Sequence, residues 1–422
     1  MKAKTLSSWV LGGVAAAILT GCGGDTSDPQ SIKMWIAPNE TQEAFWSEVV
    51  TEWNASGQGL PVEFTTIPAT GSSEEAIMNA LAAGTEPDIT ENIFSGFAAQ
   101  LNELDQLVDL SKFDGYQDLI SGRNMSEIMN GWQLDGKQLV FPLYMSPVVY
   151  WWRSDILEEY GFTDVPRTYD DVYKLAKAYS VKNKRYPMQV AAGRNWWDRW
   201  FDFITMYYAA SDGKNYLNAK NQLDIDEEAA KDVLTFIDTM FTNGWASYDF
   251  GESAPLVTGE VVGAVRGPWD IGRFQTQYPD VIKNIKIGPM LTKDGRDNPN
   301  TLADGKGMVM FKSSDVKEEA WEFINWVYNN EKFDKRWLEL TGMPPARGDL
   351  MELDIFKEYF KANPLAAGYA EQVSLSQPTA FTSKTVEVQR AMTNMIEKII
   401  FNKTDVEGGL SGLEKEVNSI RQ

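Results

Sequence analysis

The stretch Thr258–Phe274, TGEVVGAVRGPWDIGRF, combines an apolar run, a Gly-Pro turn and an aromatic residue beside a carboxylate. Its apolar residues predict a buried strand, and Gly267-Pro268 ends that strand in a turn that carries Trp269 and Asp270. An aromatic ring beside a carboxylate suits a sugar, because the C–H faces of a sugar stack on rings and its hydroxyls bond to strong acceptors. A core tryptophan after a strand gives the same pattern, so this stretch alone leaves both interpretations open.

Strand and helix patterns alternate on either side of this stretch. Short extended runs are followed by helices with apolar residues every three or four positions, and the predicted helices include 39–57, 73–84, 168–179, 226–243 and 314–330. This alternation predicts an α/β fold whose sheet is largely parallel and covered on both faces. The C-terminal third is helical, with a long segment at 384–402 and a last helix after Gly412.

Length and composition exclude several classes of function. The 422 residues suffice for two or three domains, and 60 acidic against 39 basic residues give a net charge of −21. An acidic surface argues against nucleic acid as a partner. The chain has no histidine, which removes Ser-His, Cys-His and His-metal chemistry, and it has no phosphate-binding glycine loop of the usual spacing. We therefore expect no cofactor and no metal.

The N-terminus carries a secretion signal. Lys2 and Lys4 precede an apolar run at 9–19 that is too short to span a bilayer, and Leu19-Thr20-Gly21-Cys22 resembles a bacterial lipobox. Cys22 is the only cysteine, so it cannot form an internal disulfide. We predict a signal peptide at 1–21, a lipidated Cys22 and a flexible tether at 22–30, which place the protein outside the cytoplasm on a membrane. An ordinary signal peptide followed by a chance cysteine is the alternative.

Further motifs follow the lipobox in a fixed order. They are LAAGTEPDI at 81–89, GKQLVFPLY at 136–144, VVYWWRSDIL at 148–157, PRTYDDV at 166–172, the opening stretch, ADGKGMVM at 303–310, EEAWEFINWV at 318–327 and GMPPAR at 342–347. In this order the chain resembles the family 1 extracellular solute-binding proteins of ABC importers, the group that contains the maltose-binding protein.

The resemblance implies a two-lobe periplasmic-binding-protein fold of type II, with a hinge and a ligand cleft between the lobes. Lobe one would comprise 31–143 with 304–342, and lobe two 147–302 with 345–422. The lobes would close on a carbohydrate, and the closed form would deliver it to the permease subunits of the importer. Such a protein is a monomeric binding component and catalyses no reaction.

The resemblance also assigns candidate ligand-binding residues. Trp269 would be a stacking platform in the cleft, with Asp270 as a neighbouring acceptor. Asn39 and Glu40 would follow the first strand and bond to hydroxyls, although helix capping explains them equally well. Tyr144 and Ser146 would lie where the chain crosses between the lobes.

Five further residues complete the predicted site. Trp196 and Trp197 are adjacent aromatics in a polar loop, and we expect at least one of them to face the ligand. Gly305 and Gly307 would allow close backbone approach beside the hinge. Arg347, on a rigid turn, would bond to ligand or brace the hinge. The segment near Phe381 and Thr382 is left out, because an aromatic usual there in relatives is displaced.

Three other interpretations compete with a sugar. A cleft with tryptophan and carboxylates also suits a polyamine. Tyr207-Tyr208 matches the tyrosine pair of iron-binding relatives, but its helical spacing with apolar neighbours indicates core. Carboxylate pairs such as Asp198 and Asp202, or Asp88 and Glu91, are compatible with a glycoside hydrolase, which needs two acids across the scissile bond; in a chain with 60 acids such pairs also arise by chance.

Overall fold

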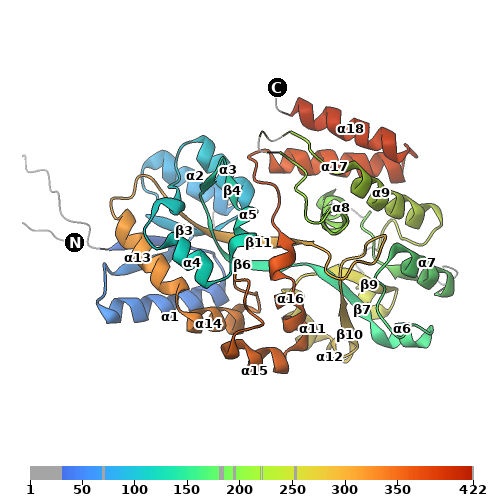
Figure 1. Cartoon of the computed structure of the whole chain (residues 1–422), viewed down its shortest axis with the longest axis horizontal. Coiled ribbons are helices and arrows are strands. Elements are labelled where there is room, and N and C mark those ends of the chain that lie inside the picture. The colour runs from blue at the N-terminus through green and yellow to red at the C-terminus, as the bar shows by residue number, and fades with distance from the viewer. Residues whose placement is uncertain are drawn as a thin grey trace, which may run out of the picture.

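The computed structural model describes residues 31–68, 72–179, 185–192, 196–218, 220, 222–250 and 254–420. The predicted signal peptide, Cys22 and the tether lie outside these ranges, as do the side chains of Trp196 and Trp197. Figure 1 shows two lobes side by side, joined at the centre by the long strands β6 (Phe141–Pro147) and β11 (Thr301–Met310). None of the helices in the described ranges has the length and hydrophobicity needed to span a membrane.

The first lobe is built on a mixed sheet of six strands. The strand order is β12-β11-β3-β1-β2, and β6 also pairs with β11; the bounds are β1 (Ile32–Ile36), β2 (Val62–Thr66), β3 (Ile89–Ile93) and β12 (Ser376–Gln377). β1 runs parallel to β2 and β3, whereas β11 runs antiparallel to β3 and β6. Its helices are α1 (Glu40–Ser56), α2 (Ser73–Ala83), α3 (Ser95–Glu103), α4 (Tyr116–Gly122), α5 (Ser126–Asn130), α13 (Lys317–Tyr328) and α14 (Glu331–Thr341). α1 and α14 lie below the sheet in Figure 1, and α2 and α3 lie above it.

The second lobe contradicts the prediction of a largely parallel sheet. Its four strands lie in the order β10 (Ile285–Gly288), β7 (Val149–Arg153), β9 (Val261–Arg266) and β8 (Tyr186–Met188). β7 is antiparallel to both β9 and β10, and β8 alone runs parallel to its neighbour. The apolar runs resemble parallel strands because helices cover this sheet too, so its strands are buried on both faces.

Helices of the second lobe include α6 (Ser154–Glu159), α7 (Tyr169–Ala178), α8 (Trp196–Ala210), α9 (Glu227–Thr242), α10 (Pro255–Thr258), α11 (Asp270–Gln277), α12 (Pro279–Ile282), α17 (Thr385–Ile400) and α18 (Val406–Ser419). Predicted helix signals are confirmed at α1, where Asn39 caps the start and Gly57, at φ 63°, ends it. The prediction that the last helix begins after Gly412 is wrong, because the Asp405 side chain accepts from the Gly408 amide and starts α18 earlier.

Helices α15 (Asp354–Ala362) and α16 (Pro364–Ala370) connect the two lobes. Phe356 and Phe360 belong to the core of lobe one, whereas Tyr369 packs in a cluster with Trp151 and Phe274 of lobe two. The Tyr369 hydroxyl also donates to the Arg266 carbonyl at 2.9 Å. The predicted lobe boundary at 345 therefore stays a prediction, since the side chains after it contact both lobes.

Candidate ligand-binding site

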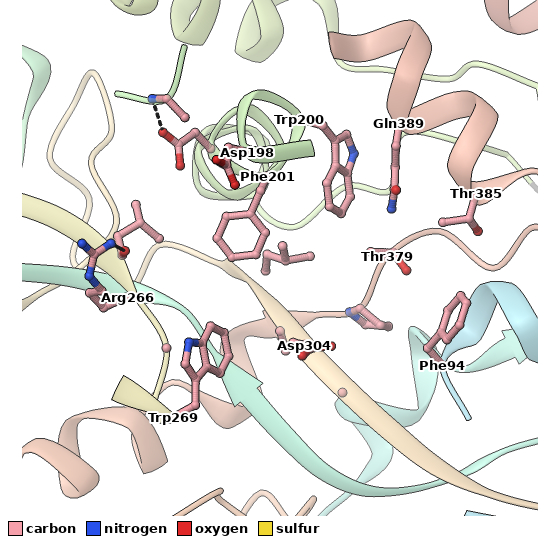
Figure 2. A pocket seen from close by; sticks show the side chains of 18 of the residues that line it. Phe94, Asp198, Trp200, Phe201, Arg266, Trp269, Asp304, Thr379, Thr385 and Gln389 are labelled. Atoms are coloured by element: carbon pink, nitrogen blue, oxygen red, sulfur yellow. Dashed lines mark hydrogen bonds between the residues drawn. The ribbon is translucent and has the colours of Figure 1, made fainter. Parts of the chain in front are cut away.

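A cavity of about 640 Å³ lies between the lobes. Its volume falls in the range of roughly 300–1,000 Å³ that is usual for small-ligand sites. Lobe one contributes Phe94 and Ser95, the joining strand β11 contributes residues 302–306, and lobe two contributes α8, α17 and the turn after β9. In Figure 2, Phe94 lies at one end of the cavity and Trp269 with Arg266 at the other.

Aromatic rings form much of the lobe-two wall. Trp269 follows Gly267-Pro268 at the start of α11, and it is 47% exposed, whereas most tryptophans of the chain are buried. A Cβ atom at Gly267 would lie 2.2 Å from the Trp269 ring, so only glycine lets the ring fold back over the turn. Trp200 and Phe201 of α8 line the same cavity. Figure 2 shows the three rings pointing into it, an arrangement on which the apolar face of a sugar can stack.

Asp270 lies in the cavity wall but is engaged by two arginines. Its Oδ1 accepts from Arg273 at 2.7 Å, and its Oδ2 is 3.5 Å from the Arg266 Nε. Arg266 also donates to the Gln189 Oε1 at 3.2 Å. Burial lowers the pKa of the Arg266 guanidinium, and the Asp270 carboxylate opposes that shift. Asp270 thus fixes Arg266 at the end of the cavity, where the guanidinium can donate to a ligand hydroxyl.

Three other carboxyl groups line the cavity: Asp198, Asp202 and Asp304. Asp202 accepts from the Ala191 amide at 2.7 Å; burial raises the pKa of Asp202 to about 7, and the nearby Asp198 carboxylate acts in the same direction. Desolvation also raises the pKa of Asp304, against the attraction of Lys306. Among the described residues, Asp304 has no side-chain hydrogen bond or ion pair. It is an acceptor available to a ligand.

The predicted hinge residues lie on the paired strands β6 and β11. Gly305 lines the cavity, and a Cβ atom there would lie 2.8 Å from the Met145 sulfur. At Gly307 a Cβ atom would lie 2.4 Å from the Phe141 carbonyl oxygen, so these strands approach closely only because both positions are glycine. Ser146, opposite Asp304 in the pairing, is fully buried, and its hydroxyl has no hydrogen-bond partner within the part of the chain that the structure describes.

Six predicted residues lie outside the cavity lining: Ser146 and Gly307 of the hinge strands, and Tyr144, Asn39, Glu40 and Arg347. Tyr144 is buried and stacks on Trp337 at 5.5 Å between ring centroids. Asn39 and Glu40 are exposed, and the Asn39 side chain accepts from the Thr41 and Gln42 amides, which is the capping interpretation. Arg347 is only 2% exposed and pairs with Asp334 and Asp349 inside lobe one. Trp196 and Trp197 begin α8, which also carries Asp198 and Phe201 to the cavity, but their side chains are not described.

Sequence reasoning missed several lining residues: Phe94, Trp200, Phe201, Arg266, Asp304, Thr385 and Gln389. Three of them lie close in sequence to predicted site residues, and this proximity could have identified them. Arg266 stands directly before the Gly-Pro-Trp turn, and Trp200 and Phe201 follow the predicted tryptophan pair. Thr385 and Gln389 occupy the segment just after Phe381 and Thr382, where no aromatic remains to mark the cleft.

Glu91 is buried in β3, three residues before the cavity residue Phe94. Its Oε1 accepts from the Ala37 amide at 2.8 Å, in the turn between β1 and α1. Desolvation raises the pKa of Glu91 from its ordinary 4.5 to about 7, and the Ala37 hydrogen bond only partly opposes this shift. Between pH 4.5 and 7 the folded protein therefore binds more protons at Glu91 than the unfolded chain does.

This proton linkage predicts that the Glu91 contribution to the free energy of unfolding falls as pH rises through that window, by about 3 kcal/mol. Below pH 4.5 both states are protonated and the contribution is constant. Glu91→Gln keeps an acceptor for Ala37 and removes the titration, so we expect urea unfolding of the variant to show a smaller decline between pH 4.5 and 7. Equal declines in the variant and the parent protein would contradict the assignment. Asp202 titrates in the same direction in both proteins, so the difference isolates Glu91.

The structure opposes the iron interpretation. Tyr207 and Tyr208 are both buried in the second-lobe core. The Tyr208 hydroxyl donates to the Pro378 carbonyl at 2.9 Å, and the Tyr207 hydroxyl accepts from the Asp226 amide. Within the described residues no group of three or more His, Cys, Asp or Glu side chains is placed to hold a metal ion.

Comparisons with known proteins place the chain in a family. Residues 48–367 match the model for bacterial extracellular solute-binding proteins. An arabinooligosaccharide-binding protein of Halalkalibacterium halodurans is 21% identical over 349 residues, covering 80% of this chain and 76% of that protein.

Solved structures of other proteins are similar to this chain over most of its length. An uncharacterized protein of Listeria monocytogenes is 31% identical with a TM-score of 0.88, covering 93% of this chain and 100% of that one. The sugar-binding protein MalE of Xanthomonas citri is 19% identical with a TM-score of 0.76, covering 92% and 97%. The predicted two-lobe fold is confirmed. The chain belongs to the bacterial extracellular solute-binding protein family.

Proposed function

We propose that this protein is the binding component of an ABC importer and captures a neutral carbohydrate, an oligosaccharide in particular. The observation that carries the proposal is the exposed Trp269 ring, which shares an interlobe cavity with Trp200 and Phe201. Such rings supply apolar area for sugar faces, while Arg266, Asp304 and Gln389 supply donors and acceptors for hydroxyls. The relatives named as binding arabino-oligosaccharides or as sugar-binding support the same ligand class.

The mechanism is closure of two lobes around the sugar. The cavity takes its walls from both lobes, so a ligand that contacts both walls stabilises the closed form relative to the open one. The closed, loaded protein then docks on the permease subunits. Cleavage of the signal peptide before Cys22 and lipidation of that cysteine would hold the monomeric protein at the periplasmic or extracytoplasmic face of a membrane. The site serves binding, and no bond of the sugar is broken.

Thermal-shift screening against mono-, di- and oligosaccharides and against spermidine tests the ligand class. A bound ligand raises the melting temperature by mass action, so a neutral sugar series should raise it in a concentration-dependent way. The carboxyl groups of Asp198, Asp202 and Asp304 also suit a cation. A rise in melting temperature with spermidine and no rise with any sugar would therefore overturn the carbohydrate proposal. Chromatography of the sugars after incubation checks for cleavage, which would instead support the hydrolase interpretation.

A further inference from the structure

A second cavity of about 540 Å³ adjoins the first, and Trp269 lines both. Lobe two contributes α11, α12 and the start of β10 to its lining, and the ends of α14 and α15 with the start of α16 form the other wall. Figure 1 shows these helices together along the lower centre of the molecule. The second cavity, like the first, therefore has walls from both lobes.

The lining of the second cavity combines hydrogen-bonding and apolar side chains. Gln275 and Lys283 come from lobe two, and Glu339, Thr341 and Asn363 come from the opposite wall. In the described ranges, the Glu339 carboxylate makes ion pairs of 3.6 Å with Arg336 and 3.9 Å with Lys335, and these long contacts leave it acceptor capacity. Apolar surface lies among them: Ile271, Ile282, Leu340 and Leu365. A sugar needs this mixture, because its hydroxyls must be paired and its C–H faces must be covered.

At the opposite end of the first cavity, residues of the two lobes contact each other directly. The Ser95 hydroxyl lies 2.9 Å from the Thr379 hydroxyl and 3.0 Å from the Thr379 carbonyl oxygen. A Cβ atom at Gly96 would lie 2.3 Å from the Thr385 hydroxyl oxygen, so α3 and the start of α17 already touch there. A ligand too long for the first cavity therefore extends at the Trp269 end.

We infer that the second cavity is a further subsite, which takes additional units of a linear oligosaccharide whose first units occupy the first cavity. The Trp269 ring lies at the junction and contacts the sugar chain as it passes from one cavity to the other. This inference rests on the proposed carbohydrate function and adds to it a preference for chain length.

Filling the second cavity tests the inference. Gly272 lies in α11, lines this cavity and has no atom within 4 Å of an added Cβ, so Gly272→Phe adds a large side chain at the cavity lining from a position with open space at its Cβ. Gly412→Phe in α18 is the matched control, because it is also a helical glycine with open space and lines neither cavity. Both variants are titrated calorimetrically with the di- and the pentasaccharide of the sugar series that raises the melting temperature.

We expect Gly272→Phe to weaken pentasaccharide binding by about tenfold or more, because the outer units lose their hydrogen bonds, while disaccharide affinity stays within about twofold. Gly412→Phe should change neither. Equal losses for both sugars would show that the cavity acts through lobe closure, and unchanged pentasaccharide affinity would show that the cavity is unoccupied; either result overturns the subsite. A parent protein that binds no sugar of any length would instead refute the proposed function, which separates the two failures.

Discussion

Replacing Trp269 by alanine is expected to weaken carbohydrate binding by roughly 30- to 150-fold and to leave the fold intact. A desolvated tryptophan at the centre of a binding surface typically contributes about 2–3 kcal/mol, which corresponds to that loss in affinity. The ring is 47% exposed in the cavity, so its removal opens little core and the melting temperature of the unliganded protein should change little. Calorimetric titration gives the affinity, and thermal unfolding without ligand gives the stability.

Tyr248→Ala is the matched control for this experiment. Tyr248 is 45% exposed, and it packs against Phe241 and Phe401 on the surface of lobe two, away from the residues that line the cavity. We expect its removal to leave sugar affinity unchanged. If Trp269→Ala bound sugar as tightly as the parent protein, the Trp269 ring would make no contribution to binding. If the variant unfolded, Trp269 would be core, as the alternative interpretation of the opening stretch holds.

Replacing Asp334 by alanine should have the largest effect on stability. Its carboxylate accepts hydrogen bonds from both Nη atoms of Arg123, at 2.7 and 2.8 Å, and from the Nη1 of Arg347, at 2.8 Å. All three side chains are at most 4% exposed. Removing the shared anion leaves two guanidinium groups buried, and breaking such a buried pair typically costs about 3–5 kcal/mol.

Urea unfolding measures this loss in the free energy of unfolding, and Glu331→Gln provides the comparison. Glu331 is 48% exposed and lies 3.9 Å from Arg347, so we expect its replacement to cost less than about 0.5 kcal/mol. A loss for Asp334→Ala as small as that for Glu331→Gln would show that water reaches the cluster. The turn after α14 that carries Arg347 is hydrogen-bonded to β6, because the Ala346 amide donates to the Leu143 carbonyl and the Pro344 carbonyl accepts from the Met145 amide. That Arg347 braces the hinge stays a prediction.

Local signals in the sequence predicted most of the helices. Asn39, Thr168 and Asp226 each cap the helix that their position predicted, because side-chain capping depends on residues within one turn. Strand direction in lobe two was predicted wrongly, because an apolar run has the same pattern whether its neighbours run parallel or antiparallel. The start of α18 was missed because glycine has a low helix propensity, and the three glycines at 408, 409 and 412 weaken the local helix pattern. Packing in the folded protein outweighs this low propensity.

The candidate site was predicted only where a turn or a motif marked it. Trp269 could be predicted because its Gly-Pro-Trp turn resembles the turn that faces the ligand in the family. Asp304 and Gln389 could not, because their role depends on β11 and α17, which are far apart in sequence, meeting at the cavity. Asp304 in particular sits in β11 between buried residues, and only the pairing of β11 with β6 places it in the cavity. That at least one of Trp196 and Trp197 faces the ligand stays a prediction.

Isothermal titration calorimetry of the mature protein with neutral oligosaccharides and with spermidine tests the central claim most directly. The account predicts saturable binding of one oligosaccharide per chain, unchanged sugar recovered after the titration, and no comparable heat from spermidine. Saturable spermidine binding with no heat from any sugar, or recovery of shortened sugars, would contradict it.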